Sequence, residues 1–209
     1  LAILTNNGFA TGGTGGGQLV QGNVASATFE GFVLGSLGGS LARGNLSVVN
    51  TSSGFDAGGN GTQQMVGNVA LGNDFVGFIA ALHGEVVLTG NVAIGNGRGL
   101  FGGHGETVTI TGLAAIANVQ GGVHNQGTST MSISASNLVG NGAKALGGSA
   151  NCGTANERSP LAASNVFWGA VTGPGGDPAD AVCDLGPGTT TVAPFATKAF
   201  KITAKVPQI

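Results

Sequence analysis

The densest group of side chains that could do chemistry is an acidic cluster near the C-terminus, formed by Asp177, Asp180 and Asp184. Oxygen ligands on a loop suit Ca²⁺, so these residues are candidate ligands for a calcium ion. Their spacing does not follow a known calcium-binding loop, and a solvated turn is the alternative interpretation. The sequence suggests no other cofactor.

Two cysteines, Cys152 and Cys183, lie in the same C-terminal region, on segments that we expect to be loops. They predict a disulfide bond that ties the insertion at residues 147–160 to the end of the chain. A pair of free or metal-binding thiols is the alternative, although two cysteines alone make an incomplete zinc site. A disulfide would indicate an exported protein, either secreted or located at a cell surface.

The three histidines, His83, His104 and His124, recur about every 20 residues and raise the question of a metal site. Such a site needs three or four ligands that converge on one point. Because these histidines change position relative to the repeat described below, we expect them to be corner residues in glycine-rich turns.

Hydroxyl side chains alternate with apolar ones in segments 107–111 and 130–134. This alternation is typical of a strand with one face in water and the other in the core. The candidate binding residues on the hydroxylated face are Thr107, Thr109, Thr111, Thr130 and Ser132.

These groups are carried by a repeat, since segment 67–78 returns with nearly the same sequence as segment 90–101. Asparagine recurs in a first column, with Leu113 filling one gap: Asn23, Asn45, Asn68, Asn91, Asn137 and Asn165. A second column lies five residues after the first, with its last member one residue early: Thr28, Asn50, Asn73, Asn96, Asn118 and Asn141. A third column follows about five residues later again: Val33, Phe55, Phe78, Phe101, Val123 and Leu146.

A period of about 23 residues without a helical pattern indicates a solenoid of short strands. Equivalent residues of stacked coils lie about 4.8 Å apart, so each column in the sequence predicts a ladder in space. Asparagine ladders can pass side-chain hydrogen bonds from coil to coil, and a phenylalanine column can fill the core. We therefore expect both kinds of column to hold the coil together rather than to form an active site.

The composition agrees with a packed β-structure and excludes some classes of function. The chain has 42 glycines, ten phenylalanines and no tyrosine, and 41% of its residues are hydrophobic. A net charge of -2 provides no basic field, so nucleic acid is not an expected partner. No apolar run approaches 18 residues, so no transmembrane segment is predicted.

The repeat Asn-Val-x-x-Gly-Asn-x-x-x-Gly-apolar resembles that of the right-handed parallel β-helix proteins of the pectate-lyase-like superfamily. The resemblance covers residues 22 to about 168, and segment 164–178 looks like the last coil of many secreted bacterial members. It implies an all-β, right-handed parallel β-helix (β-solenoid) of about seven coils, with three short strands per coil, over residues 1–168. A C-terminal capping loop and tail would then occupy residues 169–209. The chain begins in mid-coil, which suggests a processed chain or the C-terminal region of a longer solenoid.

Enzymes of this superfamily that cleave acidic polysaccharides typically need clustered Asp or Glu residues with an Arg or Lys nearby. In this chain the acidic residues fall at different positions of the repeat, and the basic residues Arg43, Arg98 and Lys144 are scattered as well. The acids concerned are Glu30, Asp56, Asp74 and Glu85. No catalytic residue is therefore predicted.

The preferred function is a non-catalytic structural or adhesive protein, whose partners are further copies of itself or a surface glycan. Self-association would use the chain ends, because exposed strand edges pair readily. The alternating tail, residues 200–206, is expected to cap the last coil or to pair with another chain. The alternatives are a polysaccharide lyase or glycoside hydrolase, and a protein that binds ice or another flat surface through its hydroxylated face.

Overall fold

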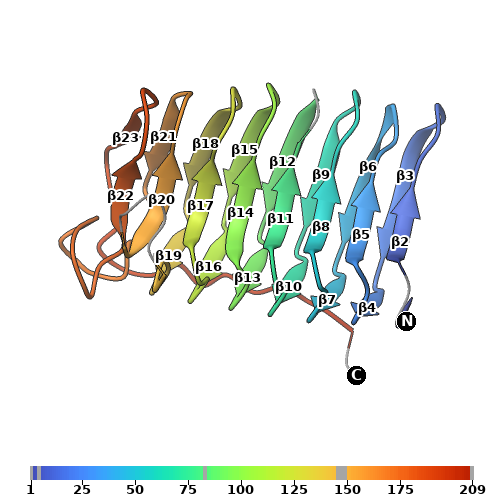
Figure 1. Cartoon of the computed structure of the whole chain (residues 1–209), viewed down its shortest axis with the longest axis horizontal. Coiled ribbons are helices and arrows are strands. Elements are labelled where there is room, and N and C mark those ends of the chain that lie inside the picture. The colour runs from blue at the N-terminus through green and yellow to red at the C-terminus, as the bar shows by residue number, and fades with distance from the viewer. Residues whose placement is uncertain (1, 4–5, 82–83, 145–149, 208–209) are drawn as a thin grey trace.

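The computed structural model describes residues 2–3, 6–81, 84–144 and 150–207, and the side chains from residue 6 onward. These residues form a parallel β-solenoid in which each coil adds one strand to each of three sheets (Figure 1). The described residues contain no helix, and so none that could cross a membrane. The predicted all-β solenoid with a period of about 23 residues is confirmed.

The three sheets are parallel throughout, and neighbouring strands within a sheet belong to successive coils. Sheet A has seven strands: β1 (Ala2–Ile3), β4 (Val24–Ser26), β7 (Leu46–Val48), β10 (Val69–Leu71), β13 (Val92–Ile94), β16 (Ala114–Ile116) and β19 (Asn137–Val139). Sheet B has eight: β2 (Asn7–Thr11), β5 (Glu30–Leu34), β8 (Ser53–Ala57), β11 (Val76–Ala80), β14 (Arg98–Gly102), β17 (Gly121–Asn125), β20 (Cys152–Asn156) and β22 (Ala181–Asp184). Sheet C also has eight: β3 (Gly16–Gln21), β6 (Gly38–Arg43), β9 (Gln63–Val66), β12 (Glu85–Thr89), β15 (Thr107–Thr111), β18 (Thr130–Ser134), β21 (Leu161–Ser164) and β23 (Thr190–Val192). Sheets B and C thus continue past residue 168.

The corner between sheet C and sheet A depends on glycine. A residue with φ between 59° and 69° occupies this corner in five successive coils, at Gly22, Gly44, Gly67, Gly90 and Gly112. Glycine adopts this left-handed conformation without steric cost, which explains its recurrence at the sharpest turn of each coil.

The second asparagine column forms a continuous buried ladder at the corner between sheets A and B. In each coil the side-chain Oδ1 accepts hydrogen bonds from the backbone N–H and the Nδ2 of the preceding asparagine, as Asn96 does from Asn73 at 2.9 and 2.7 Å. The ladder ends at Asn141, whose Nδ2 donates to the buried Asp180 carboxylate at 2.7 Å. A carboxylate only accepts hydrogen bonds, so it suits the end of a chain of donors.

The first column is a ladder only from Asn23 to Asn91. Leu113 follows, and Ser136 then takes the column position and accepts from the Leu113 N–H at 2.9 Å. The prediction that Asn137 and Asn165 belong to this ladder is wrong. Asn137 is the next residue, on the outer face of sheet A, and Asn165 lies at the C–A corner with a φ of 54°.

The phenylalanine stack in the core runs through Phe9, Phe32, Phe55 and Phe78, with ring centroids 4.7 to 5.1 Å apart. Leu100 and Val123 continue it in register. Phe55 and Phe78 were therefore assigned correctly, whereas Phe101 is not in the stack and faces outward. Leu146 lies outside the described residues.

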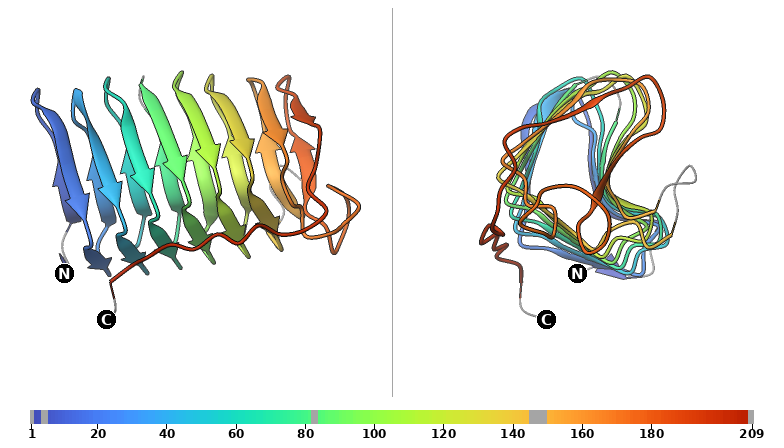
Figure 2. Two further views of the ribbon diagram at one scale, coloured as in Figure 1. Left: turned by 180° about the vertical axis from the view of Figure 1, so that it is seen from behind. Right: turned by 90° about the vertical axis from the view of Figure 1, so that its left-hand side faces the viewer.

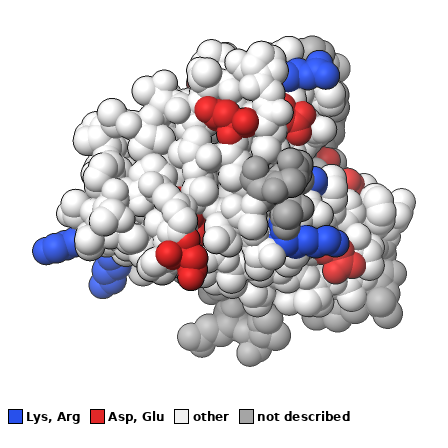
Figure 3. All heavy atoms as spheres, turned by 60° about the vertical axis from the view of Figure 1, so that its left-hand side comes forward, with Lys and Arg blue, Asp and Glu red and all other residues white. Residues whose placement is uncertain are grey.

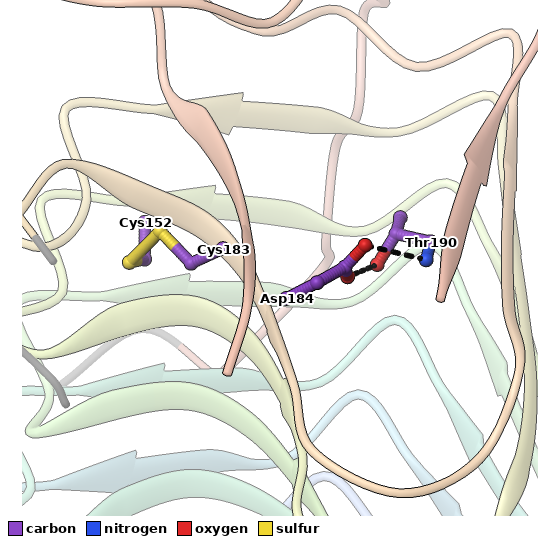
Figure 4. The surroundings of a disulfide bond; sticks show 4 residues. All are labelled: Cys152, Cys183, Asp184 and Thr190. Atoms are coloured by element: carbon purple, nitrogen blue, oxygen red, sulfur yellow. Dashed lines mark hydrogen bonds between the residues drawn. A yellow bond between two sulfur atoms is a disulfide. The ribbon is translucent and has the colours of Figure 1, made fainter. Parts of the chain in front are cut away.

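The predicted disulfide joins Cys152 and Cys183 (Figure 4). Contrary to expectation, both cysteines lie in strands, β20 and β22, which pair in sheet B. The buried Trp168 indole packs next to Gly153, between this last coil and the loop that follows residue 168. The C-terminal loop therefore caps the solenoid.

The alternating tail, residues 200–206, does not cap the last coil, and it pairs with no strand of the described chain. It runs back along the solenoid as an extended strap over the C–A corner (Figure 2). The Asn137 side chain bonds the Phe200 backbone N–H and C=O, at 2.8 and 2.9 Å. Further along, the Lys205 carbonyl lies where a side chain at Gly44 would point, 2.8 Å from an ideal Cβ. These two contacts lie four coils apart, which is roughly 19 Å along the solenoid axis. The five residues from Phe200 to Lys205 span about 17 Å when fully extended, so the strap is nearly straight.

Candidate binding face on sheet B

The strand register brings several polar and aromatic side chains together on the outer face of sheet B. Asp56, Ile79, Phe101 and His124 occupy equivalent positions on four successive strands. Arg98 lies in the neighbouring column, three residues before Phe101. Residues that are far apart in the sequence thus share one surface.

Two phenylalanines hold the Arg98 guanidinium. It lies 5.1 Å from the centroid of the Phe75 ring and 5.8 Å from that of Phe101. Cation–π contacts of this kind contribute about 0.5–2 kcal/mol, depending on how far the cation is desolvated. Burial lowers the pKa of Arg98, and the Glu157 carboxylate partly opposes that effect. The result is a fixed side-chain layer of Phe75, Arg98 and Phe101.

His124 connects this layer to an acid. Its ring meets the Phe101 ring edge-on, with centroids 5.5 Å apart, and its Nε2 lies 3.0 Å from the Glu157 carboxylate. Burial lowers the pKa of His124, the hydrogen bond to Glu157 raises it, and the Arg98 charge lowers it again. Because burial is the largest effect, we assign a neutral imidazole that donates from Nε2 to Glu157.

A pocket of about 300 Å³ opens beside these residues, at the corner between sheets B and C. Phe101 forms an apolar wall, while His104, Gln126, Thr128, Glu157 and Arg158 supply hydrogen-bonding groups around it. Glycines 103 and 127 complete the lining. A concave site with one aromatic wall and a polar rim suits a small polar ligand that also has an apolar face.

Two acidic residues lie on the same face, toward the N-terminal coils. Burial, and to a smaller extent the negative charge of Glu30, raise the pKa of Asp56 to about 6. Burial also raises the pKa of Glu30. Asp56 therefore carries a proton more readily than an ordinary aspartate.

This environment predicts a pH dependence of stability. The folded-state pKa of Asp56 lies above its usual value of 3.8, so the folded state binds the proton more tightly than the unfolded state. We expect the free energy of unfolding to rise as the pH falls from about 7 to about 4. Asp56→Asn should raise the free energy of unfolding at pH 7.5 by at most about 3 kcal/mol.

Urea denaturation of both proteins across this pH range tests the expectation. The variant should also show a smaller pH slope, the rest of which we assign to Asp180 and Glu30, whose pKa values burial also raises. An unchanged slope, or a less stable variant at pH 7.5, would contradict the assignment. Asp74→Asn is the matched control because Asp74 is an exposed acid.

The hydroxyl residues predicted from the sequence do form an array on sheet C. Thr107 pairs in register with Thr130, and Thr109 with Ser132, with the hydroxyl side chains outward and exposed or half-buried. Glu85 and Val87 on β12 and Ala162 on β21 interrupt the array on its two sides. A binding role for this face stays a prediction.

The three C-terminal aspartates do not come together. Asp180 is buried against Asn141, whereas Asp184 accepts from the Thr190 N–H and Oγ1 at 3.2 and 2.8 Å (Figure 4). Asp177 is exposed. Burial raises the pKa of Asp180 and outweighs the hydrogen bonds from Asn141 and Gly140, which lower it, so that the pKa lies at about 6. No group of three or more His, Cys, Asp or Glu side chains in the described ranges is arranged to hold a metal ion, so the geometry does not support the calcium prediction.

Sequence reasoning missed the sheet B cluster. It placed His124 at a corner, whereas His124 lies within β17, and it treated Arg98 and Asp56 as scattered. His83 lies outside the described residues. The sequence contains a signal for this shared column, because Asp56 and His124 both follow their second-column asparagine by six residues.

Charged side chains are few on the face drawn in Figure 3, and on its right-hand part those of opposite sign lie near one another, so no extended field of one sign forms on that side. Comparison with protein-family models, with curated proteins and with solved structures found no match to this chain.

Proposed function

We propose that the chain is an exported, non-catalytic β-solenoid that binds glycans at the pocket beside Phe101. The single observation that carries this proposal is the combination of an aromatic wall with a polar rim in one pocket. A sugar ring has apolar C–H faces and a polar edge of hydroxyl groups, and this pocket offers a counterpart to each.

The surroundings of the pocket support a binding role. Arg98, Phe75 and His124 all contact Phe101, so its ring is held before a ligand arrives. A preorganised site loses less conformational entropy on binding than a mobile one. The rigid solenoid would present this face as an adhesive or structural surface protein does.

Export is supported by the disulfide between Cys152 and Cys183, because such bonds persist in oxidising compartments. The resemblance of the repeat to the pectate-lyase-like superfamily points the same way. We also propose assembly of the same rod through its chain ends as a second mode of action.

Phe101→Ala is expected to weaken glycan binding by about 30-fold, which corresponds to about 2 kcal/mol. The physical reason is the loss of the phenyl ring that forms the apolar wall of the pocket. A screen of neutral and acidic oligosaccharides on an array would find the ligand, and calorimetry would then compare the variants.

Phe29→Ala is a matched control for this experiment, because Phe29 is a 51% exposed phenylalanine that does not line the pocket. Its affinity should equal that of the unmodified protein. The proposal fails if no oligosaccharide binds, or if the two variants weaken binding equally.

A second candidate function, glycoside hydrolysis, is favoured by one observation. Glu30 and Asp56 interact electrostatically on neighbouring strands of the same face, and the raised pKa of Asp56 suits a proton donor. Release of reducing ends from a polysaccharide, abolished by Asp56→Asn and retained by Asp74→Asn, would establish this activity. A protein that binds an oligosaccharide and leaves it intact would exclude that oligosaccharide as a substrate.

A further inference from the structure

Asparagine is followed directly by glycine at four places in this chain, and such a pair is open to spontaneous deamidation. The four pairs are Asn7-Gly8, Asn60-Gly61, Asn96-Gly97 and Asn141-Gly142. In this reaction the backbone nitrogen of the glycine attacks the side-chain carbonyl carbon of the asparagine, and glycine has no side chain to obstruct the attack. The reaction therefore needs an accessible asparagine amide and a glycine N–H that is not held in a hydrogen bond.

Three of the four pairs are held by the strands and ladders of the solenoid. Asn96 and Asn141 are buried members of the second asparagine ladder. The glycine N–H that follows each of them donates to a carbonyl of the preceding coil, at 3.0 Å from Gly97 and at 2.8 Å from Gly142. Segment 7–8 lies within β2, which pairs in register with β5. Deamidation at these pairs requires local opening of the fold.

The pair Asn60-Gly61 has a different environment, in the loop between β8 and β9 at the corner between sheets B and C. Asn60 is exposed. Within the part of the chain that the structure describes, neither the Asn60 side chain nor the Gly61 N–H makes a hydrogen bond. The amide carbon and the attacking nitrogen are thus both available in the folded protein.

The packing of the coils requires glycine at position 61. An ideal Cβ at Gly61 would overlap the Gly39 nitrogen and would lie 2.6 Å from the Leu37 carbonyl oxygen. Both atoms belong to the backbone of the preceding coil, which cannot move aside as a flexible side chain could. This corner therefore combines an exposed asparagine with an obligatory glycine.

We infer that Asn60 is a site of spontaneous deamidation, and that it reacts faster than the asparagines of the other three pairs. The Gly61 nitrogen forms a bond to Asn60 Cγ and loses its proton, and the side-chain nitrogen leaves as ammonia. The product is a cyclic succinimide. Water then adds to one of the two ring carbonyls and opens the ring, which leaves aspartate or isoaspartate at this position. The reaction consumes one water molecule and needs no enzyme, metal or oxidant.

The modification changes both the charge and the main chain of this corner. Either product adds a carboxylate two residues before Thr62, whose hydroxyl donates to the Glu85 carboxylate of the next coil at 3.0 Å. Isoaspartate also inserts a methylene group into the main chain, where the backbone at Gly61 already lies against the preceding coil. Like charges and close packing both oppose the product, so the aged protein should be less stable than the fresh protein.

Incubation of the folded protein at mildly alkaline pH, followed by peptide mapping with mass spectrometry, tests the inference. Deamidation at Asn60 should be at least about 10-fold faster than at the other three pairs, because each of those must first lose a hydrogen bond. Isoaspartyl methyltransferase should label the aged protein at this position. Asn60→Gln should abolish the label, because the longer side chain places its carbonyl carbon farther from the attacking nitrogen.

Asn6→Gln is the matched control, because Asn6 is also exposed but is not followed by glycine. This variant should gain the label at Asn60 at an unchanged rate. Circular dichroism establishes that each variant is folded, and the mapping of the unmodified protein tests the order of the rates without any variant. The inference is wrong if Asn7, Asn96 or Asn141 deamidates first, or if the two glutamine variants gain the label equally.

Urea denaturation of fresh and aged samples measures the consequence for the fold. The midpoint of the unmodified protein should fall with age, and that of Asn60→Gln should stay constant. An equal fall in both proteins would overturn the assignment of the lost stability to Asn60.

Discussion

Asn96→Ala is expected to lower the free energy of unfolding by about 4 kcal/mol, one of the two largest effects that we predict. The Asn96 side chain is fully buried and takes part in four hydrogen bonds. Its Oδ1 accepts from the N–H and the Nδ2 of Asn73, and its Nδ2 donates to the Ala70 carbonyl and to Asn118 Oδ1. Alanine would leave the N–H and Nδ2 of Asn73 without their acceptor and would remove one donor each from the Ala70 carbonyl and from Asn118 Oδ1, which keeps only the Asn96 backbone N–H.

This loss of stability comes from the burial of the polar groups rather than from the number of hydrogen bonds alone. A buried polar group without a partner lowers the free energy of unfolding by about 1–3 kcal/mol, because it has lost its hydrogen bonds to water and makes none within the protein. Urea denaturation followed by circular dichroism would measure the change. Asn60→Ala is the control, since Asn60 is exposed in the loop between β8 and β9, and it should change stability by less than about 0.5 kcal/mol. Equal effects of the two substitutions would show that the ladder does not stabilise the fold.

The second asparagine ladder was predictable because one residue type recurs at nearly constant spacing. The first ladder was not predictable beyond Leu113, because the column changes from asparagine to serine at Ser136. Asn137, the adjacent residue, matches the column by type but points to the other face of the sheet. In a β-strand a slip of one residue always reverses the direction of the side chain.

A shift of one residue also explains why Phe101 lies on the outer face and not in the core stack. A constant offset of five residues from the second column gives Phe55 and Phe78 correctly. In the coil that begins its turn at Asn96, the corner between sheets A and B is one residue shorter, as Val76 pairs with Arg98. Leu100 therefore takes the inward position, and Phe101 becomes part of the outer face. In the sequence, the shorter corner is visible as a step of 22 residues from Asn96 to Asn118.

The sheet B cluster also depends on the end of the chain. Glu157 lies within the insertion at residues 147–160, so no fixed period places it beside His124, and the hydrogen bond between them spans 33 residues. The position of the strap was equally hidden. Its alternating pattern indicated an extended amphipathic segment, but nothing in the pattern identified sheet A as the surface that it covers.

Loss of the disulfide is expected to separate the unfolding of the C-terminal coil from that of the rest of the solenoid. The bond joins residues 31 apart, and closing a loop of that length stabilises by about 3–4 kcal/mol in the chain-entropy account. In a solenoid each coil contacts only its neighbours, so this loss falls on the last coil and its cap. The protein with Cys152→Ala and Cys183→Ala should therefore unfold first at that end.

Trp168 makes this outcome measurable, because it is the one tryptophan of the chain and it is buried against the last coil. In the oxidised protein, tryptophan fluorescence and circular dichroism should report the same urea midpoint. In the double alanine variant the fluorescence midpoint should fall below that of circular dichroism, and added reductant should change neither. Coincident midpoints in both proteins would mean that the cap and the coils unfold as one unit. In that case the asparagine ladder, which ends at Asp180 within the cap, would couple the end of the solenoid to its centre more strongly than the disulfide does.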